Sequence, residues 1–111
     1  MPYDQDLANR LREALAQEPG ITEKAMFGGL AFLVGGNMSV SASRRGGLLV
    51  RVDPTESDGL LGEHVEPMVM GGRQMAGWLY VAPEAITAQD HLTPWVRRSV
   101  AFARSLPAKK R

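Results

Sequence analysis

Histidine and cysteine, the residues best suited to metal binding or thiol chemistry, are rare or absent in this chain. The spacing of the histidines does not indicate a metal site. His64 and His91 are the only histidines, and there is no cysteine. A metal site needs several His, Cys or carboxylate ligands at a characteristic spacing, and neither histidine has a second one at helical spacing. The sequence therefore predicts no metal site, no disulfide, no thiol nucleophile and no bound cofactor.

Serine and glycine motifs of enzymes are missing as well. No serine lies in the G-x-S-x-G turn of a hydrolase. Four glycine pairs occur, but none fits the phosphate-binding patterns G-x-x-x-x-G-K-[ST] or G-x-G-x-x-G. We therefore expect no catalytic residue, predict that the protein is not an enzyme, and interpret the pairs as turns or bulges: Gly28-Gly29, Gly35-Gly36, Gly46-Gly47 and Gly71-Gly72.

Arginine is the residue type that offers the clearest means of contacting a ligand. Some arginines lie in or beside expected hairpin turns, and from His91 onward the chain has six basic residues and no acid. Such cations can contact phosphates, or they can keep a sheet edge and a helix face soluble. The candidates for contact with nucleic acid or a protein partner are Arg44, Arg45, Arg73, Arg97, Arg98 and Arg104.

Apolar periodicity predicts the helices that must position these side chains. Between residues 4 and 18 apolar side chains recur every four positions, and Pro19-Gly20 ends this first helix. A second apolar stripe predicts a last helix that ends at Leu106. A short helix is expected after Asp53, because a capping Asp, Pro54 and Glu56 follow the preferences of a helix start.

Alternating and continuous apolar runs predict five strands between the helices. Alternation of Ser39, Ser41 and Ser43 with apolar residues places the serines on the solvent face of the second strand. Consecutive antiparallel strands with separate helices predict an α+β domain with two layers, the helices covering one face of the sheet. The expected strands are Ala25–Val34 with Gly28-Gly29 as an internal bulge, Met38–Ser43, Leu48–Val52, Glu66–Met70 and Met75–Val81.

The chain of 111 residues is of a size typical of one domain. We expect that domain to span residues 1–106. The segment 107–111, which contains three basic residues, is expected to form a disordered tail. The acidic start has neither the basic region nor the apolar stretch of a signal peptide. No apolar run approaches the length of ~20 residues that spans a bilayer, so we expect a cytoplasmic protein.

The arrangement of these motifs resembles the N-terminal domain of the TfoX/Sxy family. The resemblance covers about residues 6–106, and its most specific part is the block Met26, Phe27, Gly28 and Gly29. The other matching segments are Gly36-Asn37-Met38, Leu48–Asp53, Met75–Val81 and the helix with Leu92, Trp95, Val96 and Ala103.

The resemblance implies a two-layer α+β fold of the secretion-chaperone-like kind. It also implies a link to the regulation of competence, in which two-domain family members act with an activator of the cAMP-receptor type. The family supplies no catalytic residue. We expect a non-enzymatic protein-interaction module that modulates transcription or competence. The alternative is a nucleic-acid-associated protein that uses the basic last helix and the hairpin arginines.

Two further expectations concern packing. Gly28 and Gly29 are predicted to be structural, through a positive φ or a closely approaching backbone. The helices can cover one sheet face, so an apolar patch is expected on the other face or at a sheet edge, and a homodimer would bury it. The candidate patches are Phe32, Val34, Val40 and Val50, or the set that contains Trp78 and Tyr80.

Overall fold

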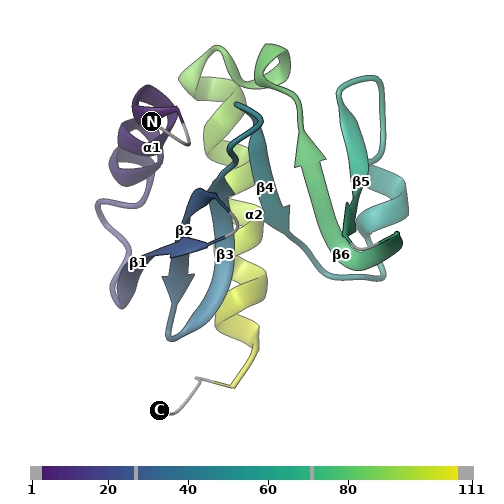
Figure 1. Ribbon diagram of the computed structural model, residues 1–111. Helices are drawn as coiled ribbons and strands as arrows, with labels where there is room; N and C mark the ends of the chain where they lie inside the picture. Colours follow the sequence, from purple (N-terminus) through teal and green to yellow (C-terminus); the bar gives the residue numbers. More distant parts are fainter. Residues whose placement is uncertain (1–3, 27, 71, 108–111) are drawn as a thin grey trace.

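A computed structural model describes residues 4–26, 28–70 and 72–107 of the chain (Figure 1). One sheet lies against two α-helices, and two short 3₁₀ helices lie in connections. The elements are α1 (Gln5–Ala14), β1 (Ile21–Met26), β2 (Gly29–Val34), β3 (Asn37–Ala42), β4 (Leu48–Arg51), η1 (Ser57–Leu60), β5 (Val65–Met70), β6 (Arg73–Val81), η2 (Pro83–Ile86) and α2 (Gln89–Ser105).

The sheet has six strands in the order β1-β2-β3-β4-β6-β5, and every neighbouring pair is antiparallel. Helix α2 runs behind the middle of the sheet and α1 lies beside it on the same side (Figure 1). The predicted α+β class with N- and C-terminal helices is confirmed. The predicted number of strands was one too few.

The additional strand arises where a single strand over Ala25–Val34 was expected. The chain reverses there, so β1 and β2 form a hairpin in which Met26 is paired with Gly29. Gly28 has a φ of 78°, which a residue with a side chain adopts only under strain. A Cβ atom at Gly29 would overlap the backbone carbonyl oxygen of Ala42. The positive φ and the close backbone approach expected for the glycine pair are confirmed, but the pair lies at a turn between two strands and not at a bulge within one.

The helix starts follow capping chemistry, with one difference from expectation. Asp4 caps α1, because its carboxylate accepts hydrogen bonds from the backbone N–H groups of Asp6 and Leu7. The short helix expected directly after Asp53 begins later. The Asp53 carboxylate instead accepts from the N–H and hydroxyl of Thr55, and a 3₁₀ helix follows at Ser57–Leu60. Only Leu60 of this turn packs against the core and none of its residues is fully buried, so little tertiary packing is available to prolong it as an α-helix.

The hydrophobic core lies between the sheet and the two α-helices. Phe32, Val40, Val50 and Leu79 occupy neighbouring strands and are almost completely buried. The first patch proposed from the sequence is therefore core, covered by the helices. On the opposite face Tyr80 is also buried, and Trp78 is partly buried. The core cluster also includes Leu7, Leu11, Leu15, Val34, Leu48, Val52, Val81, Ile86, Leu92, Val96 and Val100.

The serines of β3 and of the turn after it are buried, which corrects the expected solvent face. Ser39, Ser41 and Ser43 are exposed by only 0%, 2% and 6%. Ser39 lies where the β2–β3 register shifts, and its hydroxyl donates to the carbonyl of Phe32. The Ser43 hydroxyl accepts from the backbone N–H of Arg45 and closes the next turn. Hydrogen bonds to the backbone allow the hydroxyls of Ser39 and Ser43 to be buried.

A serine of α2 completes the sheet between β3 and β4. These strands pair at three positions, ending with Val40 opposite Val50, and then diverge (Figure 1). The next ladder pair would be Ser39 and Arg51. The Ser99 hydroxyl lies there instead, accepting from the Arg51 N–H and within donating distance of the carbonyls of Ser39 and Arg51. Helix α2 thus supplies the hydrogen bonds that the ladder lacks.

Candidate functional site

The block that carried the family resemblance builds the β1–β2 hairpin. Met26 ends β1 and is partly buried, and Gly28 and Gly29 form the turn and the first position of β2. Phe27 lies outside the described residues. Among the described residues of this block, no side chain takes part in a polar cluster. Their role is therefore to shape the backbone of the hairpin.

Arg44 and Arg45 lie in the β3–β4 turn, on the sheet face opposite the helices. The Arg45 guanidinium stacks 4.0 Å from the centre of the Tyr80 ring and lies 3.4 Å from the Glu66 carboxylate. A Cβ at Gly28 would meet the Arg44 side chain, which therefore reaches toward the β1–β2 turn. Both cations cover their own sheet, and Arg45 is already paired with an acid.

The other candidate arginines are spread over separate surfaces. Arg73 begins β6 at the tip of the β5–β6 hairpin and is exposed. Arg104, near the end of α2, forms an ion pair with Glu18 at 2.8 Å and donates to the carbonyl of Pro19. Arg97 and Arg98 alone share a site, because both line a groove on the outer side of α2. The six predicted contact residues therefore do not form one basic patch.

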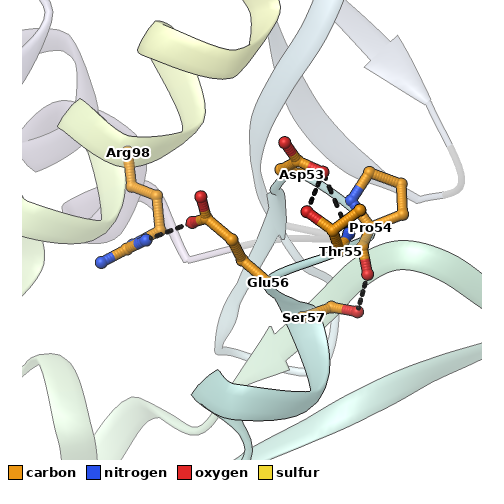
Figure 2. A network of polar contacts seen from close by, with 6 residues as sticks. All are labelled: Asp53, Pro54, Thr55, Glu56, Ser57 and Arg98. Carbon is orange, nitrogen blue, oxygen red and sulfur yellow. Dashed lines mark hydrogen bonds and ion pairs between the residues drawn. The ribbon is translucent and has the colours of Figure 1, made fainter.

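The groove beside α2 is an open depression of about 570 Å³. One wall is the segment after β4, and the other is the exposed side of the helix. Figure 2 shows the polar contacts at this wall, where Arg98 reaches across to Glu56 and forms an ion pair at 2.8 Å. The lining residues are Asp53, Glu56, Pro94, Arg97, Arg98, Ala101, Phe102 and Ser105.

Hydrogen bonding favours the charged form of Asp53, one of the two acids at this wall. The backbone N–H and hydroxyl of Thr55 donate to the Asp53 carboxylate (Figure 2) and lower the pKa of Asp53 below its ordinary value. A carboxylate with a lowered pKa is a poor general acid or base at neutral pH. The groove therefore offers charge and shape for binding, and its Asp53 carboxylate is poorly suited to proton transfer at neutral pH.

The described residues contain no cluster of side chains that could hold a metal ion. No three His, Cys, Asp or Glu side chains among them converge on one point. Glu23 is the other carboxylate with a shifted pKa, and its cause is structural: Arg12 donates two hydrogen bonds of 2.7 and 2.9 Å and lowers that pKa. Every buried polar side-chain atom that the structure describes has a partner.

A different surface holds the exposed apolar side chains. Among the described residues, the large apolar side chains that are exposed are Leu61, Val69 and Met75, at 40%, 62% and 36%. All three belong to η1, β5, β6 and their connections. We call the described residues of this segment, 61–70 and 72–75, the hairpin surface. Sequence reasoning missed it because Val69 and Met75 lie in strands whose pattern also fits a buried face.

The comparison with known families decides the identity of the domain. The TfoX N-terminal domain family matches residues 13–103. The chain belongs to this family. The TfoX N-terminal domain match begins within α1 and ends within α2, so the whole sheet, the hairpin surface and every groove-lining residue except Ser105 lie inside it.

No curated protein and no solved structure shows significant similarity to this TfoX N-terminal domain. Within the described part of the chain, none of the helices combines the length and the apolar character that a membrane span requires. The family assignment is therefore consistent with the fold, and the surfaces of the domain are the features that bear on its function.

Proposed function

We propose that this TfoX N-terminal domain is a non-enzymatic protein-interaction module that contributes to the regulation of transcription. The observation that carries the proposal is the hairpin surface. Its exposed apolar side chains contrast with the other large apolar side chains that the structure describes, which are buried or partly buried. Val69 and Met75 lie near the tip of one hairpin, where exposed apolar side chains can form a contact site for another protein.

The arginine contacts favour a protein partner over a nucleic acid. Nucleic-acid binding relies on several cations that are free to meet phosphates along one surface. Here Arg45, Arg98 and Arg104 are each paired with an acid of the same domain. Arg44, Arg73 and Arg97 form no ion pair with the described residues, but they lie on three different surfaces.

Capture of partners by the full chain tests the proposal. Val69→Glu combined with Met75→Glu places charge on the hairpin surface, and Ala16→Glu with Gln17→Glu adds the same charge to an exposed turn elsewhere. We expect the wild type and the control to retain the same set of proteins from the native cell, identified by mass spectrometry, and the hairpin variant to lose it. Equal capture by all three would reject the hairpin surface as the contact site.

A salt titration with duplex and single-stranded probes tests the alternative. Non-specific binders reach dissociation constants of about 10⁻⁴ to 10⁻⁶ M at physiological salt. Binding in this range that weakens with salt and is lost in a variant with Arg44, Arg73 and Arg97 changed to Ala would support a nucleic-acid role. Weaker binding would leave the protein-interaction function.

The homodimer remains a prediction, and the same variants test it. Sedimentation at micromolar concentration should give twice the mass of one chain if a second copy occupies the hairpin surface. The hairpin variant should then sediment as a monomer, because charged side chains oppose the burial of that surface. A wild-type mass of one chain would contradict the homodimer and leave a different protein as the partner.

A further inference from the structure

The two edges of the sheet differ in whether another strand can be added. Strand β1 forms one edge and β5 the other. An edge strand can accept a partner strand only where its N–H and C=O groups point outward and are free. The phase of each hairpin ladder shows which groups these are, because bonded and non-bonded residue pairs alternate along antiparallel strands.

The edge of β5 is closed. The bond from the Ala82 N–H to the His64 carbonyl sets the phase, so Val65 and Pro67 direct their backbone outward. Val65 already exchanges two hydrogen bonds with Gly62, at 3.1 and 3.2 Å. Pro67 has no N–H to offer. A strand approaching from this side would find little to bond to.

The edge of β1 is open along its length. The bond from the Gly35 N–H to the carbonyl of Gly20, directly opposite, sets the phase of the β1–β2 ladder. Ile21, Glu23 and Ala25 therefore point their N–H and C=O groups away from β2. β1 contains no proline and its register with β2 is unbroken over six residue pairs. These three residues offer a continuous row of donors and acceptors.

The charges of β1 favour a foreign strand over a second copy. An antiparallel self-pairing that uses all three outward residues sets Glu23 opposite Glu23, and the register one step further sets Lys24 opposite Lys24. Like charges directly opposite each other destabilise a strand pair. Arg12 neutralises Glu23 within the chain, whereas Lys24 is exposed and forms no ion pair with the described residues. The strand edge thus has one uncompensated positive charge.

We propose that the open edge of β1 binds one extended segment of a partner protein, which adds an antiparallel strand with an acidic side chain opposite Lys24. Backbone hydrogen bonds to Ile21, Glu23 and Ala25 hold the segment, and the acid selects it. The site deepens the proposed interaction function and rests on it, but it lies at the opposite end of the sheet from the hairpin surface.

Hydrogen exchange on the full chain tests the site with a defined probe. The probe is the blocked heptapeptide Thr-Val-Glu-Thr-Thr-Val-Thr, and the control peptide has Lys in place of Glu. With the probe, the amides of Ile21, Glu23 and Ala25 should exchange at least about tenfold more slowly. Thr22 and Lys24, already bonded to β2, should change little. Protection in this alternating pattern is specific to an added strand.

Matched variants separate backbone docking from other binding. Ala25→Pro removes one outward N–H at a position where an edge strand tolerates proline, and Ala25→Thr keeps that N–H. Thermal melting should show both variants folded. We expect Ala25→Pro to weaken probe binding at least about tenfold, a loss of about 1.4 kcal/mol, and Ala25→Thr to bind normally. Lys24→Glu should reverse the preference between the two peptides.

Three results would overturn the assignment. The first is the absence of alternating protection at about millimolar probe, the weakest affinity of interest. The second is equal binding by Ala25→Pro. The third is protection of the same amides without peptide that grows with protein concentration, which would assign the edge to a second copy. The double hairpin variant should bind the probe normally, so failure of this site and failure of the hairpin surface are distinguishable.

Discussion

The centre of the sheet and the β5–β6 hairpin are both built from antiparallel strands, but they differ in how much of their surface is buried. In the centre, β3 and β4 lie under α2, and even Ser39 and Ser41 are buried. In the hairpin, residues 72–76 are exposed, and Val69 keeps 62% of its surface in solvent. The difference lies in the helical cover, which ends before β5. Stability is therefore concentrated in the centre, and the hairpin is free to serve recognition.

Removal of a large side chain should separate the two regions most strongly. Phe32→Ala opens a cavity beneath the helices and should lower the free energy of unfolding by about 3–5 kcal/mol. Val69→Ala, in the hairpin, should cost less than about 0.5 kcal/mol because little is buried there. Urea denaturation of both variants gives the comparison. Similar losses would show that the hairpin is as tightly integrated as the centre.

A methyl group at the β1–β2 turn should have the next largest effect. Gly29→Ala places a Cβ against the carbonyl oxygen of Ala42, and the resulting overlap should cost about 1–3 kcal/mol. Gly59→Ala is the matched control, since a Cβ there meets no atom within 4 Å. Thermal melting reports both. A Gly29→Ala variant that melts like wild type but no longer captures partners would make this glycine functional instead of structural.

Loss of the Ser99 hydroxyl tests how α2 holds the centre together. Ser99→Ala leaves the Arg51 N–H and the Ser39 carbonyl without their partner and should cost about 1–3 kcal/mol. Ser105→Ala removes an exposed hydroxyl of the same helix that bonds only the preceding turn, and should have little effect. Hydrogen exchange at Arg51 should accelerate in Ser99→Ala alone. An unchanged rate there would mean that the strands close without the helix.

The smallest expected effect is at the surface ion pair of β1. Arg12 lowers the pKa of Glu23, so this pair stabilises the fold fully above the ordinary glutamate pKa of about 4.3 and progressively less as the pH falls through the lower folded value. Glu23→Gln should remove this dependence and cost no more than about 0.5 kcal/mol at neutral pH, because the pair is exposed. Parallel curves of stability against pH for both proteins would contradict it.

Local patterns in the sequence predicted most of the fold. The apolar stripes of both helices and the course of β4 and β6 follow from periodicity and turn chemistry. The β1–β2 reversal was mistaken for the interior of one strand, because a glycine pair within an apolar run fits a bulge, a close backbone approach or a turn until its partner strand is known. The family resemblance was confirmed by the match over residues 13–103.

The surfaces were predicted less well, because they depend on contacts between distant residues. The six arginines were named together as contact candidates from their positions in the sequence. The fold spreads them over several surfaces and pairs Arg98 with Glu56 and Arg104 with Glu18. The burial of Ser39 and Ser41 depends on the neighbouring strands and on the register shift at Ser39, which the alternation of polar and apolar residues does not reveal. Pro67 is a local signal, readable from the sequence alone, that β5 lies at a sheet edge. Which face remains uncovered required the tertiary arrangement.

The Ser99 contact also bears on the order in which the domain is made. Ser39, Arg51 and Ser99 are joined by hydrogen bonds that span 48 and 60 positions. Ribosomes deliver α2 after every strand, so a nascent chain that ends at β6 has its strands but lacks the hydroxyl that fills the gap between β3 and β4. Such a chain exposes a broken ladder and an apolar face until the last helix emerges. Closure of the sheet therefore waits for the emergence of α2.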